Sequence, residues 1–205
     1  MPSYKLIYFD FDGGRGEPIR IAFHAAGIDL EDHRVSFPQF GEMRQHLRFN
    51  ALPVLEIDGA VVTQSNAISR YVGRMGGLYP EDNLQALYCD EVSDAIEDLS
   101  HYIGSTFGLK GDDLKLAREK LVDGRMPVFL RGLDELLTRG GGKYFANNSL
   151  TVADLKAAGQ TSWLCSGSLD HVPADIVQRV APGLIAHKER VESDPRVKAY
   201  YASRS

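Results

Sequence analysis

The amino-acid sequence changes character near residue 80, and this change limits the folds that the chain can adopt. Before it, short runs of aromatic and β-branched residues alternate with helical patterns, whereas almost every later segment has helical spacing. The stretch 76–82, Gly-Gly-Leu-Tyr-Pro-Glu-Asp, is typical of a connecting segment. We therefore expect two domains, an α/β domain at 1–77 and an all-helical domain at 83–205.

The first part of the chain predicts four strands and two helices. Short apolar runs favour strands, and the pair Asp58-Gly59 between two such runs is a strong hairpin signal. Gly27 ends the first helical pattern, and Ser65 stands where the N-cap of the second is expected. The expected order is β-α-β, a loop, β-β-α, with strands at 4–9, 31–35, 54–57 and 61–63.

The second part of the chain predicts helices throughout. A long helix from about Leu84 to Leu99 has one apolar face and one acidic face. Another is expected at 114–137, with a kink or break at Pro127. Thr151 and Asp154 have the spacing of a helix-capping pair, and a last short helix is expected after Pro195.

Composition narrows the partners that the protein can have. The formal net charge is −5, so there is no positive excess to bind nucleic acid. No run is long and apolar enough for a signal segment or a membrane span, so we expect a cytoplasmic protein without a membrane partner. The two cysteines, Cys89 and Cys165, are far apart, and the six histidines have no close ligand spacing, so no metal is expected.

Four stretches of the first part resemble one known family. They are Tyr-Lys-Leu-Ile-Tyr-Phe at 4–9, Arg-Gly-Glu-Pro-Ile-Arg at 15–20, Leu-Pro-Val-Leu-Glu-Ile-Asp-Gly at 52–59 and Gln-Ser-Asn-Ala-Ile-Ser-Arg-Tyr at 64–71. These stretches are similar to the cytosolic glutathione transferases, and within them to the sigma class, which includes glutathione-dependent prostaglandin D synthases. The resemblance implies a thioredoxin-like first domain, an all-helical second domain, a homodimer and glutathione as co-substrate.

The resemblance implies that Tyr8 is the catalytic residue. The hydroxyl of its family counterpart donates a hydrogen bond to the sulfur of glutathione, which favours the thiolate and lowers the pKa of the thiol. Arg15 matches an arginine that supports this tyrosine. From the residues alone, a packed aromatic side chain of a strand is the favoured interpretation of Tyr8.

Two further pairs match residues that hold glutathione in the family. Gln64 and Ser65 stand at a helix start, which attracts carboxylates, and match the site of the γ-glutamyl carboxylate. Pro53 matches a cis proline that exposes the backbone of Leu52 to the cysteinyl part. Without the resemblance, Ser65 is a simple helix cap and Pro53 a residue that marks a strand entrance.

The sequence departs from the family pattern at three places near glutathione. Phe40 replaces a tryptophan and Ala51 replaces a lysine at the glycyl end, where Arg44 retains a basic side chain. The loop between Phe9 and Arg15 carries one residue more than the pattern, which changes its shape and flexibility. These departures predict a lower affinity for glutathione than is typical.

The remaining predicted contacts involve the second domain. Asp98 matches a residue that reaches across the dimer interface to the glutathione amino group, although a solvated acidic face explains it equally well. The electrophile pocket is expected to include Phe9, Gly14 and Tyr102 together with the segment near the C-terminus.

The predicted function is a glutathione transferase that conjugates glutathione to small hydrophobic electrophiles. A specialised glutathione-dependent isomerase or peroxidase is the alternative among enzymes, and a non-catalytic relative resembling the lens crystallins is the alternative outside them. Cysteine-type and serine-type relatives are less well matched, because both cysteines lie beyond the first domain and 10–15 contains no serine.

Overall fold

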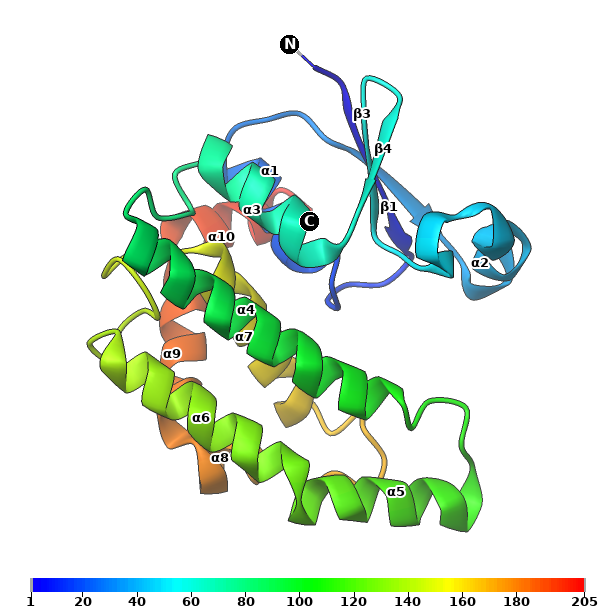
Figure 1. The fold of residues 1–205 in the computed structure, drawn as a ribbon, viewed down its shortest axis with the longest axis vertical. Coiled ribbons are helices and arrows are strands. Elements are labelled where there is room, and N and C mark those ends of the chain that lie inside the picture. The colour runs from blue at the N-terminus through cyan, green and yellow to red at the C-terminus, as the bar shows by residue number, and fades with distance from the viewer. Residues whose placement is uncertain (1, 205) are drawn as a thin grey trace. The chain divides into compact units, whose positions relative to one another are not determined.

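The computed structural model of the chain describes residues 2–204 and divides it into two compact units (Figure 1). One unit contains the chain up to Tyr79 together with the segment from Pro195 on, and the other is Pro80–Asp194. The final segment joins the first unit because α10 (Pro195–Ala202) packs against α1 (Glu17–Ala25) through the buried Val197 and Tyr200. The bounds 1–77 and 83–205 that the sequence predicts for the two domains stay a prediction.

The first unit is built on a four-stranded mixed sheet with the order β2-β1-β3-β4. β1 pairs in parallel with β2 and antiparallel with β3, which pairs antiparallel with β4. Figure 1 shows α1 and α3 on one side of the sheet and α2 on the other. Besides α1 and α10, the elements are β1 Tyr4–Phe9, β2 Glu31–Val35, α2 Phe37–Met43, two short 3-10 turns at Arg44–His46 and Arg48–Asn50, β3 Val54–Ile57, β4 Ala60–Thr63 and α3 Ser65–Met75.

The apolar runs of the sequence form the core of this unit. β1 is buried over most of its length because it is a central strand with helices on both faces. Leu6, Ile19, Leu55 and Ile68 have no exposed surface, and they come from β1, α1, β3 and α3. The predicted strands and the thioredoxin-like fold are therefore confirmed.

Two local expectations for the first unit are wrong. The segment after β2 is not a simple loop, because Ser36 accepts a hydrogen bond from the Gln39 backbone and caps α2 in a reciprocal capping box. Ser65 is not the N-cap of α3 but its first residue. Gln64 occupies the N-cap position with a positive φ of 76° and makes no side-chain cap bond.

The second unit consists of helices. They are α4 Asn83–Gly104, α5 Gly111–Asp123, α6 Arg125–Arg139, α7 Val152–Cys165, α8 Ile176–Val180 and α9 Pro182–Ser193. α7 packs against α4, α8 and α9, so it is the core helix of this unit. The helix expected at 114–137 is broken as predicted, but the break falls at Gly124 and not at Pro127. Pro127 lies in the first turn of α6, where its missing N–H costs little. None of the helices that the structure describes is long and apolar enough to cross a membrane.

The start of α7 is fixed by a buried carboxylate. Asp154 accepts hydrogen bonds from the backbone N–H groups of Thr151 and Phe145 at 2.8 and 3.0 Å, and from the Thr151 hydroxyl at 2.6 Å. Nε2 of the buried His187 on α9 lies 2.9 Å from the same carboxylate. The predicted capping pair is therefore confirmed, and it also joins α7 to α9 and to the segment before α7.

We expect Asp154→Ala to lower the free energy of unfolding by about 3–5 kcal/mol, because it removes a helix cap and leaves several buried donors without an acceptor. Chemical denaturation of the purified protein measures this loss. Asp175→Ala is the matched control, because Asp175 forms an exposed ion pair with Arg179 and its loss costs about 0.5 kcal/mol or less. Equal losses for the two variants would show that the Asp154 network contributes little.

Candidate active site

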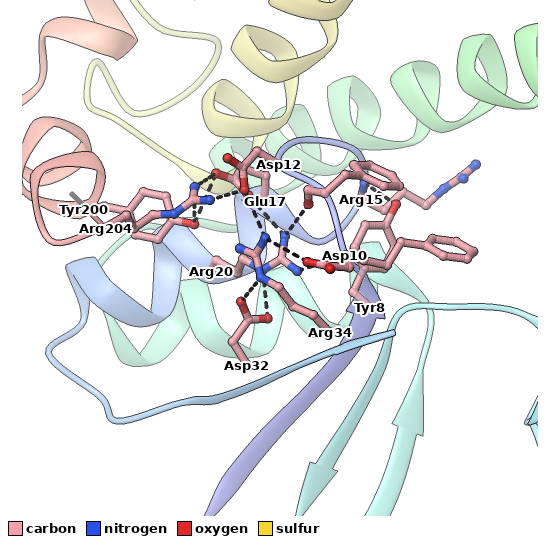
Figure 2. A network of polar contacts seen from close by, with 12 residues as sticks. Tyr8, Asp10, Asp12, Arg15, Glu17, Arg20, Asp32, Arg34, Tyr200 and Arg204 are labelled. Carbon is pink, nitrogen blue, oxygen red and sulfur yellow. Dashed lines mark hydrogen bonds and ion pairs between the residues drawn. The ribbon is translucent and has the colours of Figure 1, made fainter. Parts of the chain in front are cut away.

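Tyr8 lies near the end of β1, in the first unit, and its side chain is buried. The backbone N–H of Arg15 donates a hydrogen bond of 2.9 Å to the Tyr8 hydroxyl oxygen (Figure 2). A phenol hydroxyl accepts and donates at once, and an N–H on its oxygen strengthens it as a donor. The structure therefore links the two residues that the sequence predicted as catalytic, with the backbone of Arg15 as the donor.

The loop between β1 and α1 passes close to the Tyr8 hydroxyl. Gly14 has a φ of +60°, and a Cβ atom built on it would lie 2.6 Å from the hydroxyl oxygen. A Cβ on Gly16 would clash with the Tyr8 ring. Only glycine fits the left-handed position of Gly14 so close to the phenol oxygen, and the absence of a Cβ at Gly16 leaves room for the Tyr8 ring.

The buried guanidinium of Arg20 holds the same loop from its core side. Arg20 on α1 has 3% of its surface exposed, and its guanidinium donates to the backbone oxygens of Phe11 at 3.3 Å and Phe9 at 3.5 Å. It also pairs with Glu17 at 3.2 Å and Asp32 at 2.9 Å. Its Cζ lies 5.6 Å from the centre of the Tyr8 ring, within the range of a cation–π contact (Figure 2).

Sequence reasoning assigned no role to Arg20 or Glu17. The signal was present, because two charged residues interrupt an otherwise apolar helical stripe that includes Ile19 and Ile21. Charged residues on a buried face occur almost only when they are paired.

The start of α3 and the start of β3 contribute the predicted glutathione-binding residues. Ser65 is buried in the first turn of α3, where backbone N–H groups have no intrahelical acceptor and favour anions. The peptide bond between Leu52 and Pro53 is cis, as the resemblance implied, and both residues are buried next to β3. These features fit a backbone site for a peptide ligand.

α2 and the turn after it carry the residues predicted for the glycyl end. The Phe40 ring packs edge-on against Phe9, with ring centres 5.0 Å apart, and Arg44 lies with its Cζ 6.0 Å from the centre of the Phe40 ring. Phe40 therefore connects α2 to the end of β1. Ala51 is exposed in an extended conformation, and its methyl group donates no hydrogen bond.

Asp98 and Tyr102 belong to α4, in the second unit. Asp98 is exposed, and Tyr102 is half-buried against Phe129 and Arg125, its ring 5.8 Å from that of Phe129. Their predicted contacts with glutathione and with the electrophile involve more than one unit and stay predictions.

Neither cysteine belongs to this group of residues. Cys89 is buried in α4, and burial raises the pKa of its thiol to about 11. Cys165 is only half-buried, and burial raises the pKa of its thiol too. Both shifts disfavour a thiolate, which is the reactive form of cysteine.

The first unit has a thioredoxin-like fold, with Tyr8 near the end of β1 and a cis proline before β3, and the second unit is helical. These features define the class of thioredoxin-like proteins with an additional helical unit. Family models agree, since "Glutathione S-transferase, N-terminal domain" matches residues 4–74 and "Glutathione S-transferase, C-terminal domain" matches residues 97–204. The chain belongs to the glutathione S-transferase family.

Individual relatives support the same assignment. The hematopoietic prostaglandin D synthase of Gallus gallus is 34% identical over 206 residues, covering 100% of this chain and 98% of the relative. Glutathione S-transferase 1 of Ascaris suum is 36% identical over 160 residues, covering 76% and 77% of the two chains. The solved prostaglandin synthase D of Nilaparvata lugens is 28% identical, with a TM-score of 0.86 over 100% of this chain and 99% of that one.

This membership supports a glutathione transferase enzyme that uses glutathione as co-substrate. The relatives also include S-crystallin 4 of Enteroctopus dofleini, 28% identical over 222 residues that cover 100% of this chain and 98% of the relative. No group of three metal-binding side chains that could hold an ion occurs in residues 2–204.

We expect Gly14→Ala to lower the rate of glutathione conjugation by about tenfold or more, because the added methyl group displaces the Tyr8 hydroxyl from its position. Steady-state kinetics with a chromogenic electrophile measures the loss. Gly13→Ala is the matched control, because Gly13 also has a positive φ but its Cβ would meet nothing within 4 Å. If both variants lose activity equally, backbone strain rather than contact with Tyr8 is responsible.

Proposed function

We propose that this protein activates the thiol of glutathione as a thiolate and conjugates it to small hydrophobic electrophiles, with the Tyr8 hydroxyl as the hydrogen-bond donor. The observation that carries the proposal is the hydrogen bond from the Arg15 backbone N–H to the Tyr8 oxygen. This bond orients the phenol and polarises it, so that its proton is aimed at a developing negative charge on the sulfur.

The energy that this mechanism requires is within the reach of one hydrogen bond. An ordinary thiol has a pKa near 8.5, and lowering it by one to two units takes about 1.4–2.7 kcal/mol of preferential stabilisation of the thiolate. A hydrogen bond to a charged group contributes about 1.5–3 kcal/mol. No further cation next to the sulfur is needed to obtain a thiolate near neutral pH.

The proposed glutathione site extends from Tyr8 along the backbone of the first unit. Leu52, next to the cis Pro53, pairs with the cysteinyl part, and the start of α3 at Gln64 and Ser65 holds the γ-glutamyl carboxylate. Phe40 and Arg44 hold the glycyl end, and Asp98 of a second subunit meets the amino group in a homodimer. Because Phe40 and Ala51 replace two polar contacts, we expect weaker binding at the glycyl end.

The electrophile is proposed to lie beside Phe9, Gly14 and Tyr102. A second candidate function is a glutathione-dependent isomerase, which is favoured by the relatives named as prostaglandin D synthases. Both reactions begin with the same thiolate. Assays with a chromogenic electrophile and with a prostaglandin endoperoxide distinguish them, and a crystallin-like protein would turn over neither.

Tyr8→Phe is expected to lower turnover at neutral pH by about tenfold or more, while binding of glutathione is largely kept, because only the donor to the sulfur is lost. Titration of the thiolate absorbance of bound glutathione should show a higher thiol pKa in the variant.

Tyr4→Phe is the matched control for this experiment. Tyr4 lies on the same strand and is buried as well, but its hydroxyl lies 3.2 Å from that of Tyr71 and 3.6 Å from the sulfur of Met75. Its loss should change stability and leave the thiol pKa unaltered. Wild-type turnover and an unchanged thiol pKa in Tyr8→Phe would refute the proposed role.

A further inference from the structure

The loop over the Tyr8 hydroxyl is held from outside by two arginines that meet at one carboxylate. Asp12 lies in this loop, and its Oδ1 accepts a hydrogen bond of 3.1 Å from Nη1 of Arg34 on β2. Nη2 of Arg204, beyond the end of α10, donates to the same oxygen (Figure 2). Asp12 thus ties the loop both to the sheet edge and to the final segment.

Arg204 also reaches the buried side of the loop. Its Nη1 donates to Oε1 of Glu17 at 2.7 Å and to the Tyr200 hydroxyl at 3.1 Å. The Tyr200 hydroxyl donates to the same Glu17 oxygen at 3.1 Å, while Oε2 of Glu17 accepts from Arg20 at 3.2 Å. Glu17 is buried, so it joins Arg204 to the cation that holds the backbone of Phe9 and Phe11.

The exposure of the partners shows which of these contacts are strong. The Asp12 side chain is 65% exposed, and an exposed ion pair by itself contributes little. The Glu17 side chain is only 6% exposed, so its pair with Arg204 is far less screened and anchors the guanidinium that also reaches Asp12. Burial by itself would raise the pKa of the Asp12 carboxyl, but the hydrogen bonds from Arg204 and Arg34 outweigh it and hold the pKa below its usual value.

We propose that Arg204 is a positioning residue of the thiolate site, which acts through Asp12 to fix the loop that presents the Arg15 N–H to Tyr8. This inference rests on the proposed function. Between Asp12 and Arg15 the chain has only Gly13 and Gly14, whose φ values are +100° and +60°. Two glycines are easily reoriented, so the loop needs an external contact to hold one conformation.

A purely structural role for Arg204 is the competing explanation, because the same contacts attach α10 to α1. The two roles differ in what they change. Loss of the attachment between α10 and α1 lowers stability alone. Loss of a positioning contact weakens the hydrogen bond from Arg15 to Tyr8 and raises the pKa of the thiol of bound glutathione. That pKa, measured well below the unfolding temperature, is therefore the decisive quantity.

The experiment compares Arg204→Ala, Arg204→Lys and Asp12→Asn in the full-length protein, with Arg179→Ala as the control for loss of an arginine from an ion pair elsewhere. We expect Arg204→Ala to raise the thiol pKa by about half a unit, which leaves roughly threefold less thiolate at pH values below it. The thiol pKa of Arg204→Lys should lie between those of wild type and Arg204→Ala, because one ammonium group cannot reproduce the simultaneous contact with Asp12 and Glu17. Arg179→Ala should have the thiol pKa of the wild type.

Asp12→Asn separates positioning from a direct charge effect. If only the field of the charges mattered, loss of the Arg204 cation would raise the thiol pKa and loss of the Asp12 anion would lower it. Positioning through the Arg204–Asp12 contact predicts a rise in both variants. It also predicts that the double variant shows about the same shift as either single one rather than their sum.

An unchanged thiol pKa in Arg204→Ala, or shifts of opposite sign in Arg204→Ala and Asp12→Asn, would overturn this inference. Circular dichroism at the assay temperature shows whether each variant is folded, and Asp12→Asn provides the answer if Arg204→Ala does not fold. Tyr8→Phe, measured in parallel, separates the two proposals. If Tyr8→Phe leaves the thiol pKa unchanged, the proposed function fails. If Tyr8→Phe raises the thiol pKa but the Arg204 and Asp12 variants do not, only the role of Arg204 fails.

Discussion

The first unit depends on one buried guanidinium. Arg20 is almost inaccessible to solvent, and a buried cation is tolerated only when anions and carbonyl oxygens surround it. Here these partners are Glu17, Asp32 and the backbone oxygens of Phe9 and Phe11. The end of β1 and the start of the following loop therefore have to lie where Arg20 can reach them, and this places the Tyr8 hydroxyl next to Arg15.

The same strand shows why one tyrosine and not another suits the proposed chemistry. Tyr4 and Tyr8 are both buried on β1, but hydrogen bonding to Tyr71 together with burial raises the pKa of Tyr4 to about 12. Its hydroxyl contacts the Tyr71 hydroxyl and the sulfur of Met75. The Tyr8 hydroxyl instead meets a backbone N–H, in a loop where Gly14 has no side chain to cover it. The surroundings of the phenol, not its residue type, make it a candidate donor.

The elements with regular apolar patterns were predictable from the sequence, and those with local or tertiary causes were not. β1 and β3 have the bounds that their apolar and β-branched runs predicted, since a buried strand leaves a simple pattern. α2 was missed because Phe-Pro-Gln-Phe-Gly carries a proline and a glycine and buries no residue, although Ser36 and Gln39 form a capping box. A charge on the apolar stripe of α1 indicated that Arg20 is paired, but its partner Asp32, twelve residues away, is visible only after folding.

The resemblance implies one extra residue in the loop after β1, and such an insertion is compatible with a precise site for a physical reason. Lengthening a short loop by one residue costs only a few tenths of a kcal/mol in closure entropy, so the fold itself tolerates it. The larger effect is on the conformations that the loop can adopt, because Gly13 and Gly14 add backbone freedom next to Tyr8. Asp12, held by Arg34 and Arg204, restricts that freedom from the loop's exposed side, while Arg20 restricts it from the buried side. The hydroxyl that we propose as the donor thus lies beside a loop with contacts on both sides, and the outer set is the one that surface substitutions can alter without disturbing the core.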